Sequence, residues 1–311
     1  MSEPILHHYP TSPFSEKIRA ILGYKQMAWK SVFIPTVMPK PDLVALTGGY
    51  RKTPVLQIGA DIYCDTKLIV QVLDSLKPDP PLIPHGQAFS CAAYEQWTEE
   101  VLFFLTVPIV MQPAGMGHFF ATLPPAAADY FRKDRQALFA SGNGRRPTTA
   151  ATRSQLPALM HKLDRQLAAS QYVLGEAPSL ADFSVYHPIW FVLSNPGVAS
   201  EFAQYKNVLA WARRIEAFGH GQPSKMTGEE AVQLARTSKP RAVEDTVPDP
   251  TQLKLGDEVV VSAVDYGADP VIGVLAQSST ESFAISRSDP RAGDVVVHFP
   301  RSGFKLAAAE K

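Results

Sequence analysis

The sequence predicts three parts in order along the chain: a mixed α/β domain, an all-helical domain and a small all-β domain. Over residues 1–80, short apolar runs alternate with stretches of helical periodicity. Over residues 87–220 only the helical period is present, and beyond residue 250 the apolar positions recur every second residue. A chain of 311 residues has room for two or three domains of ordinary size, so the three patterns fit its length.

The first part alternates strands and helices. Apolar runs bounded by turn residues indicate the strands, and apolar positions three and four residues apart indicate the helices. The expected elements are a strand beginning at 5, a helix from 13, a strand at 29–34, a short helix at 42–46, a hairpin of 54–58 and 62–63, and a helix from 65 that stops before the prolines of 78–84. This order predicts a small mixed sheet with helices packed on it.

Ser12 and Pro13 stand where the strand pattern changes to the helical one. Proline fits the first helical position because its missing N–H would be unpaired there, and Ser12 fits the N-cap because its hydroxyl can accept from an amide of the first turn. A helix N-terminus also stabilises a thiolate or carboxylate through its free amides and the helix dipole. Two interpretations of Ser12 are therefore open, a helix cap and an active-site hydroxyl.

The second part is a succession of helices separated by glycine and proline. The helices are expected at 87–111, 125–140, 152–169, 180–193 and 208–218. Pro108 and Pro113 are expected to kink or end the first of them. Ser179 and Asp182 lie three residues apart before an apolar run and form a capping box with Asp in place of Glu. We therefore interpret Asp182 as structural rather than catalytic.

The third part follows a stretch rich in glycine and proline. Residues 221–250 surround one helical piece at 228–236 and are expected to be a linker with a short helix. Residues 251–311 hold four short strands separated by Gly or Asp-Pro turns, which predicts a small SH3-like barrel. From residue 245 onward, ten acidic residues stand against six basic ones, a net charge of −4. Because an acidic barrel is a poor ligand for phosphate backbones, a protein-contact or lid role is expected.

The overall composition is that of a globular protein, with 45 % hydrophobic and 19 % charged residues. The formal net charge of zero gives no sign of a general binder of nucleic acid or anionic membranes. The longest apolar run, Val101–Met111, is too short to span a bilayer, and a soluble cytoplasmic protein is expected. Cys64 and Cys91 indicate a reducing compartment and buried packing roles, and the histidines lack the spacing of metal ligands.

Four stretches of the first 220 residues stand out together, in order Thr11–Arg19, Arg51–Leu56, Asp61–Thr66 and Gly175–Phe183. In this order they resemble the cytosolic glutathione transferase family, which has a thioredoxin-like domain followed by an all-helical one. Thr11–Arg19 resembles the family's active-site turn and first helix, and Arg51–Leu56 resembles the segment with the cis-proline. Asp61–Thr66 resembles the hairpin that leads into the glutamyl-binding pair, and Gly175–Phe183 the capping-box helix. The resemblance implies glutathione as cosubstrate, no metal, a homodimer, and a detoxifying transfer of the glutathione thiolate to a small hydrophobic electrophile.

The resemblance also implies a role for the polar residues of these stretches. Ser12 would donate to the glutathione sulfur, while the helix dipole favours the thiolate. Pro54, if cis, would turn the Thr53 backbone toward the cysteinyl part of the tripeptide. Asp65 would pair with the γ-glutamyl ammonium group. Thr66 and the helix amides would bind the γ-glutamyl carboxylate. Glutathione contacts are also expected at Phe14 and Lys52, with Arg51 or Lys52 meeting the glycyl carboxylate.

The chain departs from the family pattern at three places. Omega-like members, whose turn is most similar, carry cysteine where Ser12 stands, so a mixed disulfide with glutathione cannot form at this position and thiol-disulfide reduction is disfavoured. With serine at this turn, the chain resembles the bacterial type of the family. Tyr9 lies near the place where other classes put a catalytic tyrosine and is the second candidate hydroxyl. Asp65 replaces the commoner glutamate, and the segment after residue 250 has no counterpart in the ordinary family.

The electrophile pocket is expected between the first helix and the long helix from residue 87. An apolar stripe on a helix is more often plain core than the lining of a pocket. The candidate pocket residues are Phe14, Met38, Phe103, Phe104, Val107, Met111 and His118. A non-catalytic scaffold or regulator, with the barrel as its partner surface, is the competing interpretation of the chain. The joint presence of Ser12, Pro54, Asp65 and Thr66 favours the enzyme.

Overall fold

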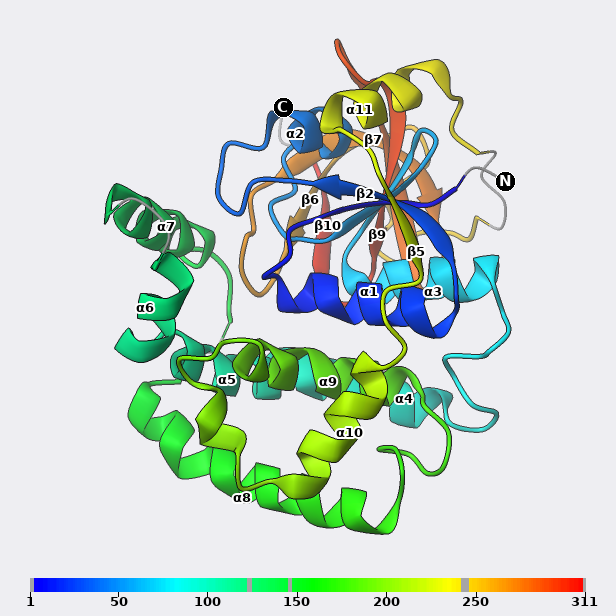
Figure 1. The fold of residues 1–311 in the computed structure, drawn as a ribbon. Coiled ribbons are helices and arrows are strands. Elements are labelled where there is room, and N and C mark those ends of the chain that lie inside the picture. Colours follow the sequence, from blue (N-terminus) through cyan, green and yellow to red (C-terminus); the bar gives the residue numbers. More distant parts are fainter. Residues whose placement is uncertain (1–2, 122–124, 145–146, 242–245, 310–311) are drawn as a thin grey trace.

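The computed structural model describes residues 3–121, 125–144, 147–241 and 246–309. The strands of this part of the chain form one ten-stranded sheet in the order β10-β6-β7-β8-β9-β4-β3-β1-β2-β5. A layer of helices lies below the sheet, and α1 and α3 are packed between the two (Figure 1). The shorter helices α2 and α11 lie on the opposite face of the sheet.

The first part has the elements that the sequence predicts. They are β1 Ile5–His8, α1 Pro13–Tyr24, β2 Ala28–Phe33, α2 Pro41–Thr47, β3 Val55–Ile58, β4 Asp61–Cys64 and α3 Thr66–Leu76. β1 pairs in parallel with β2 and antiparallel with β3. β3 and β4 form the predicted hairpin, with Val55 opposite Cys64. Both cysteines are free and buried, as expected.

The second part is helical, as predicted. Its elements are α4 Ala88–Trp97, a π-helical turn η1 Thr98–Leu102, α5 Phe103–Val110, α6 Pro113–Phe120, α7 Pro125–Leu138, α8 Thr149–Ala169, α9 Leu180–Leu193, a 3₁₀ turn η2 Ala199–Phe202 and α10 Lys206–Glu216. Pro108 lies inside α5, and the chain turns by 76° between Val110 and Pro113. Among the described helices, none alone is long and apolar enough to cross a membrane. The bent pair Ala88–Val110 and Pro113–Phe120 meets the criteria of length and composition only when the two are taken together.

Asp182 holds the start of α9 at the centre of the helical part. Its carboxylate accepts from Ser179 N at 2.9 Å and from Val173 N at 2.8 Å. It also accepts from Trp211 Nε1 at 2.9 Å, although the side chain is fully buried. Burial raises the pKa of this carboxyl. The capping box predicted from the sequence is therefore present, and it joins α9 to α10.

Asp182→Ala is expected to lower the free energy of unfolding by about 2–3 kcal/mol, because four buried donors, the Ser179 hydroxyl among them, lose their acceptor at once. Chemical denaturation monitored by tryptophan fluorescence measures the change. The capping box of α11 offers a matched control, since Thr227 accepts from Glu230 N at 3.2 Å in an exposed position. Thr227→Ala is expected to cost only about 1 kcal/mol. Equal losses in the two variants would contradict the central role of Asp182.

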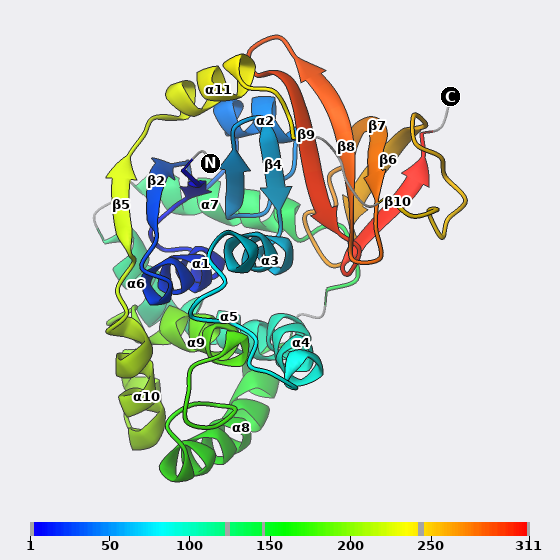
Figure 2. The same ribbon diagram turned by 90° about the vertical axis from the view of Figure 1, so that its right-hand side faces the viewer.

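The third part is built of strands, as predicted, but it continues the first sheet. Its elements are β5 Gln222–Lys225, α11 Gly228–Thr237, β6 Glu258–Ala263, β7 Val271–Ser278, β8 Ser282–Asp289, β9 Gly293–Pro300 and β10 Phe304–Ala308. β9 pairs in parallel with β4, with Ile62 opposite Val297 (Figure 2). At the other edge, β5 of the expected linker pairs in parallel with β2. The closure of these strands into an SH3-like barrel stays a prediction.

Two cores result from this arrangement. One lies between the sheet and the helical layer and is centred on Ile18, Ile21, Phe183 and Trp211. The other lies on the opposite face of the sheet, where apolar residues of α2 and α11 meet those of β6 to β10. The C-terminal strands are thus packed into the molecule and share a core with the first part.

Candidate functional site

Ser12 is the N-cap of α1 and lies at the wall of a cleft between the first part and the helical layer. Its Oγ accepts from Ser15 N at 3.1 Å, and Pro13 takes the first helical position. The side chain is 2 % exposed. Because a hydroxyl can donate and accept together, capping leaves the Ser12 proton for a group bound in the cleft.

Arg19 fixes the turn that carries Ser12. Its guanidinium donates to Pro10 O at 2.9 Å and to Tyr9 O at 3.3 Å. Glu16 pairs with the same guanidinium at 2.7 Å. Burial, and then the charge of Arg19, lower the pKa of His8 to about 3, so this neighbouring imidazole is neutral and can accept at Nδ1 from Arg19 at 3.1 Å. The turn is therefore held by main-chain contacts that the sequence does not reveal.

The second wall of the cleft is the segment before β3. The Thr53–Pro54 peptide bond is cis, as the resemblance implies. Thr53 Oγ1 accepts from Lys40 Nζ at 3.1 Å. Burial, and then the charge of Arg135, lower the pKa of Lys40 to about 8. Arg51, a candidate for the glycyl carboxylate, is paired with Asp134 of α7 at 3.0 Å.

Asp65 and Thr66 meet a buried group of charges from the helical layer. Asp65 has a φ of +74° and accepts from Lys67 N at 3.0 Å. Thr66 Oγ1 donates to Glu99 Oε1 at 3.1 Å. Lys17 Nζ lies between Glu95 and Glu99, at 2.6 and 3.1 Å. Sequence reasoning missed Lys17, Glu95 and Glu99, because the partners stand about 80 positions apart in the chain.

Two carboxylates keep this buried lysine charged. Burial alone would lower the pKa of Lys17, but the charges of Glu95 and Glu99 outweigh it and raise the pKa. For Glu99 burial alone would raise the pKa, but the charges of Lys17 and Lys67 outweigh it and lower the pKa to about 2. Both groups are therefore ionised at neutral pH. Burial, followed by the charge of Glu99, raises the pKa of Asp65.

Lys52 is held by the C-terminal strands. Its Nζ lies 2.5 Å from Asp265 Oδ1 and 4.3 Å from the centre of the Tyr266 ring. Both partners lie between β6 and β7, more than 200 positions away in the chain. The loop between β6 and β7 therefore takes part in the candidate site, and the protein-contact or lid role expected from the sequence stays a prediction.

A polar hollow and an apolar cleft meet at this place. The polar hollow is lined by Phe14, Tyr50, Lys52, Thr53, Pro54, Asp65, Thr66, Glu99, Asp265 and Tyr266. The apolar cleft is lined by Tyr9, Thr11, Ser12, Pro13, Phe14, Lys40, Arg51, Lys52, Thr53, Phe103, Val107, Val110, Met111, Met116, Phe119, Phe131, Arg135, Leu138, Phe139, Phe191 and Tyr266. Phe14, Lys52, Thr53 and Tyr266 line both spaces.

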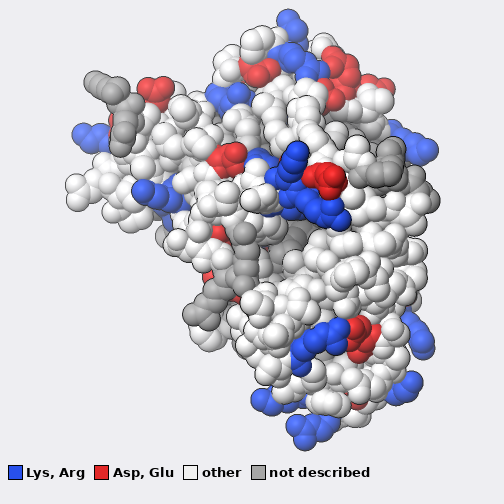
Figure 3. Space-filling view, turned by 90° about the vertical axis from the view of Figure 1, so that its left-hand side faces the viewer, with Lys and Arg blue, Asp and Glu red and all other residues white. Residues whose placement is uncertain are grey.

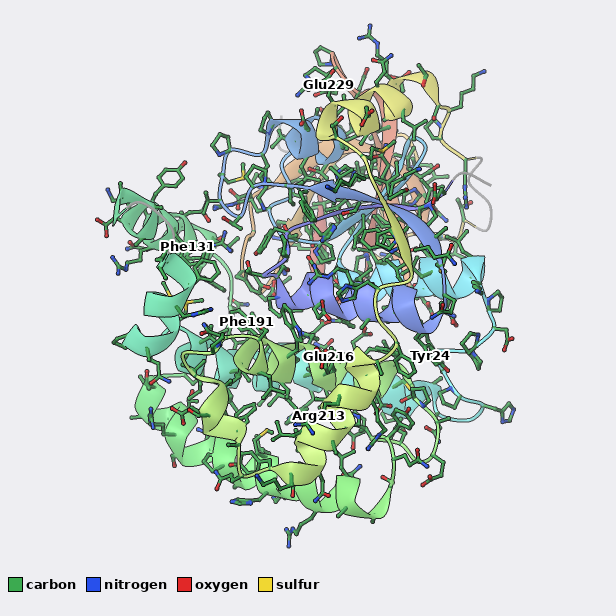
Figure 4. The ribbon with its side chains drawn as sticks, viewed as in Figure 1. Tyr24, Phe131, Phe191, Arg213, Glu216 and Glu229 are labelled. Carbon is green, nitrogen blue, oxygen red and sulfur yellow. The ribbon has the colours of Figure 1, made fainter. Side chains whose placement is uncertain are left out.

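The apolar cleft opens on the side of α6 and α7. On this side the surface is hollowed near its centre, and Lys and Arg side chains gather above the hollow (Figure 3). Figure 4 marks two rings of the wall, Phe131 on α7 and Phe191 on α9. The cleft, its open mouth included, holds about 890 Å³. Apolar and aromatic side chains make up most of its lining, which suits a small hydrophobic ligand.

The structure brings together most of the predicted pocket residues. Phe14, Phe103, Val107 and Met111 line the apolar cleft, and so does Tyr9. The remaining three lie elsewhere. Met38 is bound through its backbone N to Asp134 and through its backbone O to Tyr130, both on α7. Phe104 packs behind the wall of the cleft, against Tyr266 and Phe139. His118 is exposed on α6.

Sequence reasoning missed the wall that α7 contributes. Phe131, Arg135, Leu138 and Phe139 line the cleft. Their spacing of four, three and one residues places them on one face of the helix and its end, and this periodicity was the available signal. It did not indicate which partner the face would meet.

Comparisons with known proteins agree with this geometry. The family model of the glutathione S-transferase N-terminal domain matches residues 6–81, and that of the C-terminal domain matches residues 146–214. A search of curated protein sequences gave no match. The crystal structure of a GST-like protein from Pseudomonas syringae is 41 % identical, with a TM-score of 0.83. The match covers 99 % of this chain and 100 % of that one, and therefore includes the C-terminal strands.

More distant structures share the fold alone. A glutathione S-transferase from Rhodospirillum rubrum F11 is 15 % identical, with a TM-score of 0.52 and coverage of 69 % of this chain and 88 % of that one. A glutathione S-transferase from Sinorhizobium meliloti 1021 is 18 % identical, with a TM-score of 0.51 and coverage of 70 % and 89 %. With two domain models matched in order and 41 % identity to a GST-like protein over nearly its whole length, the chain belongs to the glutathione S-transferase family.

Proposed function

We propose that the protein is a glutathione transferase that joins the glutathione thiolate to a small hydrophobic electrophile, with Ser12 stabilising the thiolate. The observation that carries the proposal is the junction of the polar hollow with the apolar cleft at Phe14 and Thr53. A polar tripeptide and an apolar electrophile can therefore be bound side by side. Ser12 lines the cleft close to that junction.

Glutathione would lie across the three predicted segments. The amides at the start of α3 and the Thr66 hydroxyl would bind the γ-glutamyl carboxylate, and Asp65 the ammonium group. Thr66 would then give up its hydrogen bond to Glu99 for one to the γ-glutamyl carboxylate, and Glu99 would keep Lys17 and Lys67 as partners. The backbone of Thr53 would pair with the cysteinyl part. Lys52 would meet the glycyl carboxylate, and Lys40, beside Thr53, is a further cation for the same role.

Ser12 would lower the pKa of the thiol by donating to the sulfur, since a hydrogen bond to a charged acceptor is stronger than one to a neutral acceptor. The free thiol has a pKa near 8.5, so even a modest decrease makes the thiolate abundant at neutral pH. The thiolate then attacks the electrophilic carbon, forms a C–S bond and displaces a leaving group or adds to a double bond. The apolar wall keeps water from competing.

Glutathione at millimolar concentration is expected to raise the melting temperature of the protein. A ligand that binds only the folded state adds RT ln(1 + [L]/Kd) to the free energy of unfolding. This is about 2.7 kcal/mol when the ligand concentration is one hundred times Kd. Thermal shift with glutathione measures this, and turnover of halides, epoxides and enones tests the chemistry. Glutathione disulfide and a tripeptide without the γ-glutamyl group serve as specificity controls. An unchanged melting temperature would contradict both binding and catalysis.

The competing proposal is a scaffold or regulator that binds glutathione without turnover. The engagement of Lys52 by Asp265 and Tyr266 favours it, because the chain itself occupies part of the polar hollow. Binding together with absence of turnover over the whole electrophile panel would distinguish it. A cytoplasmic location, a role in detoxification and a homodimer also stay predictions. Since β9 covers the edge of β4, a second copy would use other surfaces of the first part.

A further inference from the structure

The loop between β6 and β7 reaches from the C-terminal strands to the helical part. We call residues 264–268 the bridging loop. Val264 O accepts from Asn143 N at 2.8 Å, and Asp265 O accepts from Gly144 N at 2.8 Å. Gly267 N donates to Leu138 O at 2.8 Å. Three main-chain hydrogen bonds therefore tie the bridging loop to the end of α7 and the turn after it.

Glycine makes this close approach possible. Gly142 has a φ of +88°, and a Cβ on it would lie 2.2 Å from Asp265 O. Any side chain at position 142 would push the two backbones apart. The bridging loop is therefore seated against the helical part by backbone contact, and its position relative to the cleft is defined.

Tyr266 is the side chain that this seating presents to the site. Its ring packs on Phe139 at 4.8 Å and on Phe104 at 6.0 Å between ring centres. Its other neighbour is the Lys52 ammonium group at 4.3 Å. Tyr266 lines both the polar hollow and the apolar cleft. Burial raises the pKa of the phenol well above its ordinary value, so the ring is neutral near pH 7.

The geometry points to Tyr266 as a specificity-determining residue. Its ring forms an aromatic wall at the place where the substituent on the glutathione sulfur enters the cleft. Tyr266 thereby selects planar aromatic electrophiles over aliphatic ones of similar size. The same cleft carries further rings, since Phe14 and Phe103 also line it and pack against each other at 4.8 Å. An aromatic substituent bound against these rings gains contacts that a flexible alkyl chain does not. The inference rests on the proposed function, since it assigns the substrate class of the same site.

The test uses two glutathione thioethers and the full-length protein. S-benzylglutathione and S-hexylglutathione carry an aromatic and an aliphatic group, and S-methylglutathione reports binding of the tripeptide alone. Titration calorimetry gives the three dissociation constants. Tyr266→Leu keeps bulk without the ring, Tyr266→Ala removes both, and Tyr266→Phe keeps the ring. Tyr130→Ala is the matched control, because Tyr130 is 52 % exposed on α7 and does not line the cleft.

The wild type is expected to prefer the benzyl thioether to the hexyl one. Tyr266→Leu is expected to reduce this preference about threefold to tenfold, while Tyr266→Phe and Tyr130→Ala leave it unchanged. Affinity for S-methylglutathione shows whether each variant is folded. An unchanged preference in both Tyr266→Leu and Tyr266→Ala would overturn the inference and leave the proposed transferase intact. Selective thioether binding without turnover of any electrophile would contradict the proposed function alone, and absence of all thioether binding would overturn both.

Discussion

Replacement of Lys17 by methionine is expected to lower the free energy of unfolding by about 3–5 kcal/mol, because it leaves the buried Glu95 without its cation and Glu99 with Lys67 alone. The Lys17 side chain is fully buried, and its ammonium group lies 2.6 Å from Glu95 and 3.1 Å from Glu99. Lys17 is on α1, Glu95 is on α4, and Glu99 is on the π-helical turn η1 that follows it. The same charges therefore connect α1 with the helical layer beside Thr66.

The loss is expected to depend on pH. Above the ordinary carboxyl pKa of 4.5, the lowered pKa of Glu99 contributes stability, and this contribution is lost as the pH falls through about 2. In Lys17→Met, Glu99 loses its nearer lysine, so its pKa rises toward the ordinary value and acid removes less stability. The difference between wild type and variant is therefore expected to narrow from pH 5 to pH 2. Urea denaturation at several pH values measures it.

Lys30 gives the matched control for this prediction. It pairs with Glu3 at 3.2 Å, and its side chain is 34 % exposed. Lys30→Met is expected to change the stability by less than about 1 kcal/mol, since exposed ion pairs contribute little. A loss of that small size in Lys17→Met would show that the buried carboxylates find other partners or are protonated at neutral pH.

Ser12→Ala is expected to raise the pKa of the bound glutathione thiol by about 1 to 2, because a hydrogen bond to a charged acceptor contributes about 1.5–3 kcal/mol. The loss of one donor to a developing or resting anion lowers kcat by about 10²-fold in enzymes that depend on such a contact. Thiolate absorbance in the complex against pH gives the pKa, and turnover of an active electrophile gives kcat and KM.

Two comparison variants separate the hydroxyl's roles. Ser12 also caps α1, so Ser12→Ala is expected to cost about 1 kcal/mol of stability. Ser12→Thr restores a hydroxyl at the same helix end and is expected to recover most of both losses. Tyr9→Phe tests the second candidate, which lines the same cleft. A raised thiol pKa in Tyr9→Phe, together with an unchanged one in Ser12→Ala, would transfer the role to Tyr9.

Much of the fold follows from local patterns. Helical spacing after Pro13, the hairpin at 54–64 and the capping box at Ser179 are decided by residues within a few positions of one another. The four stretches quoted above are local in the same sense. Ser12, the cis Thr53–Pro54 bond and the pair Asp65–Thr66 therefore carried the sequence-based prediction of the site.

The largest difference from expectation concerns the C-terminal strands. Their period of two predicts strands but not their neighbours, since a sheet edge pairs through the backbone, whose groups are the same in every residue. The structure places β9 against β4 and β5 against β2. The segment that the sequence sets apart is thereby joined to the first sheet at both edges.

The same distinction holds for the candidate site. The sequence by itself determined which residues cap and begin α1 and α3, because caps and proline positions depend on nearest neighbours along the chain. Only the tertiary structure decided that Lys17 would find Glu95 and Glu99, and that Lys52 would lie under Tyr266. These contacts join residues about 80 and more than 200 positions apart. Long-range packing chooses such partners, and no local period records that choice.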